Sequence, residues 1–414
     1  MDMNLLIDCF KKLEPLFDTA QYDELTKVCE KMLSIDERNT DAMLYLCRAY
    51  AKQDKIDEAI QVCKKLLEID PNHFQAMFEL ANLYSSKMMY NDAIDAFTKT
   101  LELNDSFIQA YNGRGWAYFH LREYSKAISD FYKTAKFTKT AQDSYCGLGW
   151  TYLLKEEYSQ ALLFFNKAID INEKCANAFR GRGLTYLAEQ KFNKAEKDID
   201  AALKLDPNSA DTFIAKGHLC YGTKKFNKAI EYYMQALNID TDNQDVYKGL
   251  GKVYFETKQY SKAIYALSKA ILNNSNDSSL FYLRGNAYTL NNQNNNAILD
   301  YSQAIKLTPQ KADYYQQRGS LYKNMNLNDL ALADFVKYFE LSYNMECKDH
   351  NFLTAKAYAV IKEYDKAIAE FDKVIMQKSQ YKEEAKEEKL SIYLNKRSYG
   401  KYVKELVCSH FGKN

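Results

Sequence analysis

The chain has 414 residues, 47% of them hydrophobic, with only four prolines and 14 glycines, and its 56 basic side chains nearly balance 55 acidic ones. So few helix-breaking residues predict a mostly helical protein, and a net charge of +1 gives no reason to expect a nucleic-acid partner. No apolar stretch is long enough to span a membrane, and nine cysteines without a CxxC pair favour a soluble protein in the reducing cytoplasm.

A 34-residue period organises the chain. In chain order, ten units without insertions are expected at 6–39, 40–73, 74–107, 108–141, 142–175, 176–209, 210–243, 244–277, 278–311 and 312–345. An eleventh follows two residues out of step at 348–381, and residues 382–414 are expected to form a helical cap. Small residues mark two phases of the period, an alanine such as Ala127 or Ala161 and a glycine such as Gly115 or Gly149. Three prolines, Pro71, Pro207 and Pro309, share the phase at the end of the unit.

Each unit predicts two helices joined by a turn. In the unit 108–141, Tyr111, Gly115 and Tyr118 fall on one helical face. Ala127, Phe131 and Thr134 fall on a second face, after a turn near 122–123. The small residues let the two helix axes approach closely, and the terminal proline ends the second helix. Pro15 inside the first helix and Ala355 in place of the glycine suit end units, which need not pack on both sides.

This pattern resembles the tetratricopeptide repeat family, whose period and arrangement of small, aromatic, alanine and proline positions match residues 6–381. The resemblance implies an all-α, right-handed superhelical solenoid of antiparallel helix–turn–helix repeats. It also implies a concave groove lined by the first helix of each unit.

A comparison of the units with one another predicts an internal ion pair. Arginine precedes the phase glycine in four units, and the same four units carry aspartate at one position of the second helix: Arg114 with Asp130, Arg182 with Asp198, Arg284 with Asp300, and Arg318 with Asp334. Other units have residues such as Leu148, Leu250 or Leu80 in place of the arginine, and Phe164, Ala266 or Ala96 in place of the aspartate. We therefore expect Arg–Asp pairs that bridge the two helices. A row of arginines that binds carboxylates is the alternative.

The candidate partner-binding site lies on the first helices, opposite the packing stripe. Trp116 and Trp150 share one phase there, and Gly113, Gly147, Gly181 and Gly249 are expected on the same side with uncovered backbone. The expected groove residues are Trp116, Phe119, Trp150, Leu153, Leu184 and Leu187, followed by polar His218, Lys248 and Lys252. Exposed aromatic residues favour a peptide or partner helix as ligand. The alternative is that each tryptophan packs against the first helix of the next unit.

No chemistry-bearing motif remains outside the repeat. Nucleotide-loop, zinc-protease, serine-hydrolase and zinc-finger patterns do not occur, and the five histidines are dispersed, so no catalytic residue, cofactor or metal is expected. Cys9, Cys29, Cys47, Cys63 and Cys220 fall at packing phases and are expected to act as small apolar residues.

The sequence therefore predicts a non-catalytic scaffold or adaptor that binds a protein partner in its groove. The alternative is a regulatory or structural subunit of a larger complex, docking through its edges or convex face. Some members of the family hold acidic chaperone C-termini in a carboxylate clamp. That clamp is not expected here, because no asparagine occupies its central phase, where the chain has residues such as Glu79, Gly113 and Gln317.

Overall fold

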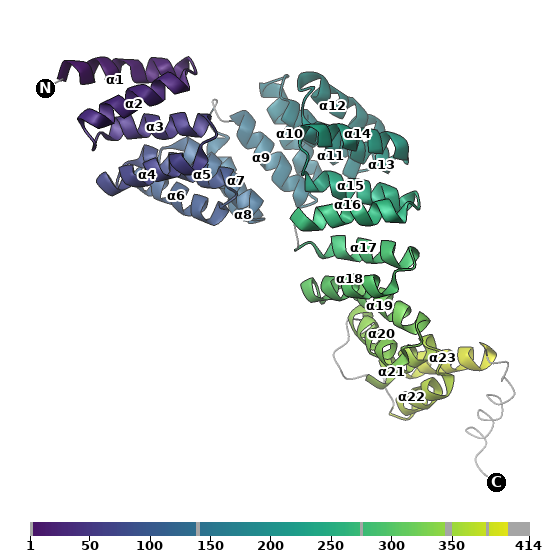
Figure 1. The fold of residues 1–414 in the computed structure, drawn as a ribbon. Coiled ribbons are helices and arrows are strands. Elements are labelled where there is room, and N and C mark those ends of the chain that lie inside the picture. Colours follow the sequence, from purple (N-terminus) through teal and green to yellow (C-terminus); the bar gives the residue numbers. More distant parts are fainter. Residues whose placement is uncertain (1–2, 138–140, 274–275, 344–349, 378–380, 396–414) are drawn as a thin grey trace, which may run out of the picture. The chain divides into compact units, whose positions relative to one another are not determined.

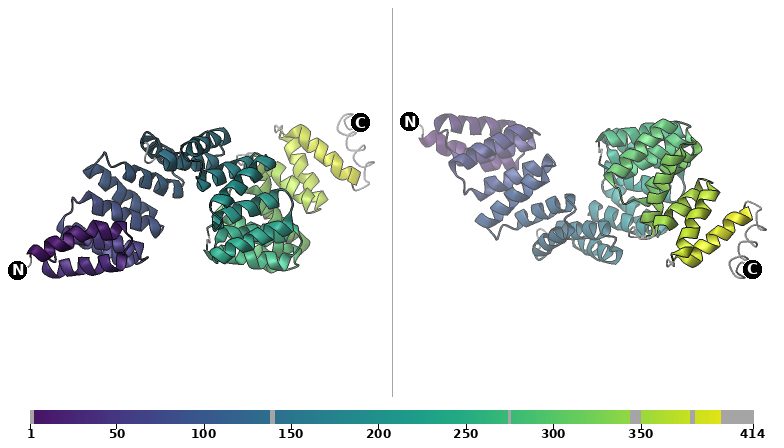
Figure 2. Two further views of the ribbon diagram at one scale, coloured as in Figure 1. Left: turned by 90° about the horizontal axis from the view of Figure 1, so that it is seen from above. Right: turned by 90° about the horizontal axis from the view of Figure 1, so that it is seen from below.

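The computed structural model describes residues 3–137, 141–273, 276–343, 350–377 and 381–395. Within these ranges the chain folds into 23 α-helices, and consecutive helices pack as antiparallel pairs (Figure 1). The chain divides into two compact units, 1–215 and 216–414. Figure 2 shows the succession of helices from two further sides. The predicted all-α fold of helix–turn–helix units is thus confirmed.

The helices are similar in length and follow one another without long connections. In the first unit they are α1 (Met3–Asp18), α2 (Tyr22–Ile35), α3 (Thr40–Lys52), α4 (Ile56–Ile69), α5 (Phe74–Ser86), α6 (Tyr90–Leu103), α7 (Ile108–His120), α8 (Tyr124–Thr134), α9 (Ala141–Leu154), α10 (Tyr158–Ile171), α11 (Ala176–Ala188) and α12 (Phe192–Leu205). The second unit begins within α13 (Ala210–Gly222) and contains α14 (Phe226–Ile239), α15 (Gln244–Glu256), α16 (Tyr260–Asn273), α17 (Ser278–Leu290), α18 (Asn294–Leu307), α19 (Ala312–Asn324), α20 (Asn328–Tyr343), α21 (His350–Val360), α22 (Tyr364–Met376) and α23 (Lys382–Asn395). In each pair the odd-numbered helix is called the first helix and the even-numbered one the second helix. Residues 396–414 of the expected cap lie outside the described residues.

Local sequence explains where these helices begin and end. Pro71, Pro207 and Pro309 each follow the C-terminal end of a second helix by two residues, as predicted. At the other end, the Asn39 side chain accepts a hydrogen bond from the backbone N–H of Ala42 and caps α3. The turn inside each pair contains one residue in the left-handed region, for example Arg122 with φ 61°. Pro15 lies inside α1, where the sequence places it.

The core is a row of rings and small residues between the two helices of each pair. A Cβ atom on Gly115 would lie 2.9 Å from Cε1 of Phe131, so only glycine allows α7 to approach α8 this closely. A Cβ atom on Gly149 would lie 2.6 Å from Cε1 of Phe165 in α10. The predicted role of this glycine phase in close helix packing is confirmed. First helices also contact the first helix of the next pair, as α7 contacts α9 and α15 contacts α17. They therefore form the inner face of the stack within each unit.

Candidate functional site

The six apolar residues of the predicted groove belong to three successive first helices of the first compact unit. Trp116 of α7, Trp150 of α9 and Leu184 of α11 occupy one phase of three successive first helices. Phe119, Leu153 and Leu187 follow almost one helical turn later, and all six side chains are half-buried. We call these six residues the inner apolar row. Because neighbouring first helices contact one another, the row continues from helix to helix.

Each indole ring packs against a phenylalanine of its own pair and donates a hydrogen bond to the next first helix. The Trp116 ring meets Phe131 edge to face at 5.2 Å between centroids, and its Nε1–H donates to Oδ2 of Asp143 on α9 over 3.2 Å. The Trp150 ring meets Phe165 at 5.5 Å, and its Nε1–H donates to Asn177 on α11 over 3.1 Å. Each tryptophan thus makes the contact with the next first helix that the packing alternative requires, while its side chain stays partly exposed.

The four glycines that were expected to leave the backbone uncovered, Gly113, Gly147, Gly181 and Gly249, each lie against an aromatic ring of the preceding pair. A Cβ atom on Gly113 would lie 2.4 Å from Cζ of Phe97, which belongs to the preceding second helix α6. The same arrangement places Phe131 on Gly147, Phe165 on Gly181 and Tyr233 on Gly249. The prediction of uncovered backbone at these four positions is therefore wrong. A helical projection shows which side faces away from the partner helix of the same pair, but it does not show that the preceding pair packs there.

The polar end of the predicted groove belongs to the second unit. His218 is partly buried in α13, where a hydrogen bond of 2.8 Å joins its Nδ1 to the hydroxyl of Tyr233. The pKa of His218 is lowered to about 4, mainly by burial; the charge of Asp245 opposes this shift, and the charges of Lys252 and Lys248 add to it. These surroundings keep the imidazole neutral at physiological pH. His218 is therefore a packing residue with a polar edge rather than a cation on the inner face.

The two lysines of this polar end differ in their partners. Lys248 of α15 pairs with Asp277, just before α17, over 2.7 Å between Nζ and Oδ2. Desolvation by the surrounding protein lowers the pKa of Lys252, and the nearby charge of Lys248 lowers it further. The inner apolar row belongs to the first compact unit, whereas His218, Lys248 and Lys252 belong to the second.

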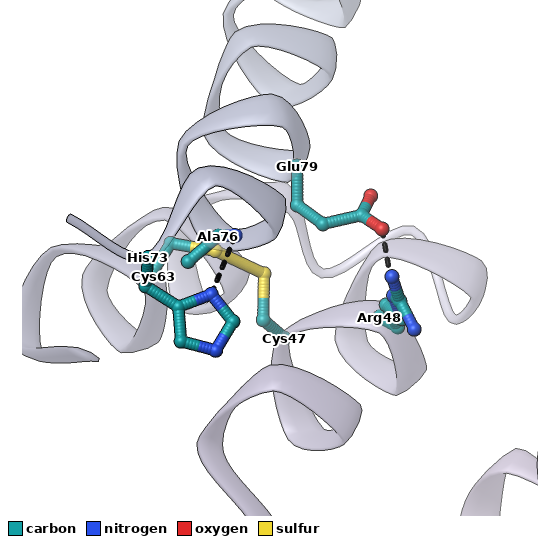
Figure 3. Close-up of a disulfide and its surroundings, with 6 residues drawn as sticks. All are labelled: Cys47, Arg48, Cys63, His73, Ala76 and Glu79. Carbon is teal, nitrogen blue, oxygen red and sulfur yellow. Dashed lines mark hydrogen bonds and ion pairs between the residues drawn. A yellow bond between two sulfur atoms is a disulfide. The ribbon is translucent and has the colours of Figure 1, made fainter. Parts of the chain in front are cut away.

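A hollow that the sequence analysis did not identify lies on the inner face near the N-terminus. It has a volume of about 360 Å³ and includes Arg48, Glu79 and Asn82 in its lining. Nε of Arg48 on α3 donates to Oε1 of Glu79 on α5 over 2.6 Å (Figure 3). Arg48 has the phase of Trp116 in its own repeat unit, so the repeat alignment contained the signal for this position.

A disulfide joins Cys47 of α3 to Cys63 of α4 beside this hollow (Figure 3). Both residues are fully buried, which confirms their predicted packing positions. The prediction that they act only as small apolar side chains is wrong, because a covalent bond joins them. The two phases face each other within one helix pair, with Cα atoms 6.0 Å apart. Cys9, Cys29 and Cys220 are buried as well, as predicted.

The predicted Arg–Asp pairs are confirmed in all four repeat units that carry both residues. Nε and Nη2 of Arg114 donate to the two carboxylate oxygens of Asp130 over 2.7 and 3.0 Å, and the other three pairs have the same bidentate geometry. Nη1 donates to the preceding second helix, at Thr98, Asn166, Ser268 and Ser302 in turn. Because every arm of the guanidinium has a partner within the chain, this geometry argues against the carboxylate-binding alternative.

Within the described residues, no group of three or more His, Cys, Asp or Glu side chains is arranged to hold a metal ion. A search of the same residues found no helix with the length and apolar character needed to cross a membrane.

Comparisons with known proteins agree with this architecture. Models described as "Tetratricopeptide repeat" match residues 16–84 and 221–287, residues 78–145 and 180–246, and residues 142–175 and 312–344. A model described as "TPR repeat" matches residues 285–326. No curated protein matches the chain.

Several solved structures resemble parts of the chain. The Cut9–Hcn1 hetero-tetramer of the APC/C is 12% identical with a TM-score of 0.46, over 83% of this chain and 95% of that one. MamA is 28% identical with a TM-score of 0.37, over 39% of this chain and 95% of that one. YrrB, described as a TPR protein with an unusual peptide-binding site, is 20% identical with a TM-score of 0.37, over 45% of this chain and 97% of that one.

The family models together extend over most of the chain, and the described helices form the antiparallel pairs that such repeats require. This chain belongs to the tetratricopeptide repeat family.

Proposed function

We propose that the protein is a non-catalytic interaction scaffold that binds a peptide or helix of a partner protein along the inner face of its first helices. The observation that carries the proposal is the inner apolar row, which presents Trp116 and Trp150 at one phase of successive helices without burying them completely. Large aromatic side chains are enriched at protein interfaces and among the few residues that contribute most of the binding energy.

The hydrogen bonds from the two indole rings to the next first helix support this role, because they fix the orientation of the rings before a partner binds. Asp143 accepts from Trp116, and Asn177 accepts from Trp150. A side chain that is already held loses little conformational entropy on binding, so more of the contact energy contributes to affinity.

The test is a cross-linked pull-down from native cell extract with the full chain. W116L/W150L places at both positions the residue that α11 carries as Leu184, so the fold should be retained. We expect the double variant to lose the proteins that the wild type captures, with unchanged helicity by circular dichroism. Unchanged capture by a folded double variant would contradict binding at the inner apolar row.

A second candidate is docking through the second helices, as a structural or regulatory subunit would do. Several apolar side chains on these helices are strongly exposed, among them Tyr265 at 64%, Leu299 at 68% and Leu272 at 78%. The variant L299A is therefore the matched control in the pull-down: loss of captured proteins in L299A and not in W116L/W150L would favour this candidate.

A further inference from the structure

Three repeat pairs hold a planar guanidinium, that of Arg114, Arg284 or Arg318, between two aromatic rings of the first helix. In α7, Cζ of Arg114 lies 5.5 Å from the ring centroid of Tyr111 and 5.9 Å from that of Tyr118. Arg284 has the same position between Phe281 and Tyr288, at 5.7 Å from each. The buried aspartate of the second helix then pairs with the arginine and closes this position.

The pair α9/α10 fills the same position with an aromatic ring. Here Leu148 replaces the arginine and Phe164 replaces the aspartate. The Phe164 ring stacks on Tyr152 at 5.5 Å with an interplanar angle of 8°, and on Tyr145 at 6.0 Å with an angle of 22°. Phe164 is only 3% exposed, so the position accepts a complete phenyl ring.

The pair α15/α16 provides the same two flanking rings but no group between them. Tyr247 and Tyr254 correspond to Tyr145 and Tyr152, while Leu250 and Ala266 occupy the positions of Leu148 and Phe164. A cavity of about 500 Å³ lies here, lined by both tyrosines, Leu250 and Ala266, and by Met234 of α14. Its volume falls in the range of ordinary ligand pockets. Tyr265, 64% exposed, and Met234, 47% exposed, also line it.

We propose that this cavity is a docking site for an aromatic side chain on an exposed segment of a partner protein. The chain itself shows which group fits, because Phe164 occupies the equivalent position in α9/α10. An arginine is disfavoured, since Ala266 supplies no carboxylate to pair with its guanidinium. An aliphatic side chain would fill space but would lose the stacking contacts that two tyrosine rings offer.

This site is separate from the proposed inner-face site. Tyr247, Leu250 and Tyr254 share one face of α15, and Lys248 and Lys252 point to another, because residues one to two positions apart project in different directions from a helix. The cavity therefore does not depend on the inner apolar row, and failure of one proposal leaves the other standing.

The experiment uses the full chain labelled with [¹³C]methyl-methionine and the probe N-acetyl-4-fluoro-L-phenylalanine amide. We expect saturable shifts of the Met234 methyl signal, assigned with M234L, and broadening of the ¹⁹F line of the probe. In A266F the introduced ring should fill the cavity as Phe164 does, and the affinity should fall at least tenfold. N-acetyl-leucine amide and N-acetyl-arginine amide should bind at least several-fold more weakly than the aromatic probe.

A gain-of-binding variant makes the test independent of the effect of A266F on folding. F164A in the A266F background empties the position between Tyr145 and Tyr152, so probe binding should return, with ¹⁹F broadening but no Met234 shift. The partner segment is tested with random peptides selected on the wild type and counter-selected on A266F, which should be enriched in aromatic residues.

Three results would overturn the proposal: equal binding of the probe to folded A266F, no Met234 shift at any probe concentration, or selected peptides without aromatic enrichment. A Met234 signal that changes with protein concentration alone would assign the cavity to a second copy of the chain and would also overturn it.

Discussion

A Cβ atom on Gly147 would lie 2.5 Å from Cζ of Phe131, the ring that the preceding second helix inserts against α9. The same ring lies against Gly115 of α7, so one phenylalanine contacts the first helices of two successive pairs. The glycine three residues before each tryptophan, Gly113 or Gly147, is therefore part of the stacking between pairs. The motif "GRG" of residues 113–115 joins a contact to the preceding pair with a contact inside its own pair.

We predict that G147A destabilises the protein although alanine favours helices. The helix propensity gain is about 1 kcal/mol, whereas overpacking of a filled core costs about 1–3 kcal/mol. The midpoint of urea denaturation should therefore fall. The matched control is L154A in the same helix, where the side chain is 50% exposed and the midpoint should change little. A higher midpoint for G147A would contradict the packing assigned to Phe131.

Removing one partner of the Arg114–Asp130 pair should destabilise the protein more than replacing both partners by apolar residues. Its side chains are 15% and 4% exposed, so D130A leaves a largely buried guanidinium without its carboxylate. We expect a loss of about 3–5 kcal/mol in the free energy of unfolding. R114L/D130F copies the residues of α9/α10 and should recover most of that loss. Equal denaturation midpoints for the single and double variants would show that Phe does not fill this position as Phe164 does.

Replacement of the turn residue Lys258 by glycine should stabilise the protein. Its φ is 60°, a conformation in which a Cβ atom costs about 1–2 kcal/mol. Glycine avoids that cost and loses about 0.5–1 kcal/mol of backbone entropy. K258G should thus stabilise the second unit by up to about 1.5 kcal/mol in urea denaturation. K262G, inside α16, is the control of opposite sign, and a stabilising effect there would invalidate the explanation.

The second unit should lose stability as the pH falls from 6.5 towards 4. The folded state holds the pKa of His218 at about 4, below its ordinary value of 6.5, mainly through burial. The unfolded state therefore binds a proton first, and stability that is complete above pH 6.5 decreases by up to about 1.4 kcal/mol per pH unit.

Thermal unfolding followed between pH 7 and pH 4 checks this prediction. H218Q removes the titrating group and should flatten the part of the pH dependence that the imidazole causes. The same slope in the wild type and in H218Q would assign the acid sensitivity to other groups.

Reduction of the Cys47–Cys63 bond should lower the stability of the first unit. The bond closes a loop with a sequence separation of 16. A loop of that size contributes about 3 kcal/mol through the entropy of the unfolded chain. The unfolding midpoint of the wild type should therefore fall in tris(2-carboxyethyl)phosphine, and that of C47A/C63A should not respond. An identical response of both proteins would contradict the disulfide.

Much of the fold could be predicted because the repeat units can be compared with one another. The co-occurrence of Arg114 with Asp130 in one unit, and of Arg182 with Asp198 in another, predicted contacts that the structure contains. The left-handed turn at Arg122 was placed by the same alignment, though its backbone conformation was not predicted.

The candidate site was less predictable, because exposure depends on the packing of neighbouring pairs. A helical projection placed Trp116 and Trp150 opposite the packing stripe, and both side chains are half-buried in the structure. It could not show that Phe97 covers Gly113, nor that Asp143 accepts from the indole of Trp116. The cavity at Tyr247 and Tyr254 was not predicted either, because the sequence does not show whether a neighbouring side chain fills the space that the small Ala266 leaves.

The sequence by itself determined the helix period, the close-packing phases and the exchangeable ion pairs, because each is a local spacing repeated in many copies. Only the tertiary structure decided which phases stay accessible. Each first helix is enclosed by its own second helix, by the preceding pair and by the following one, and the shape that remains depends on side chains far apart in the chain. The hollow at Arg48 and the cavity beside Ala266 arise where those side chains leave the space unfilled.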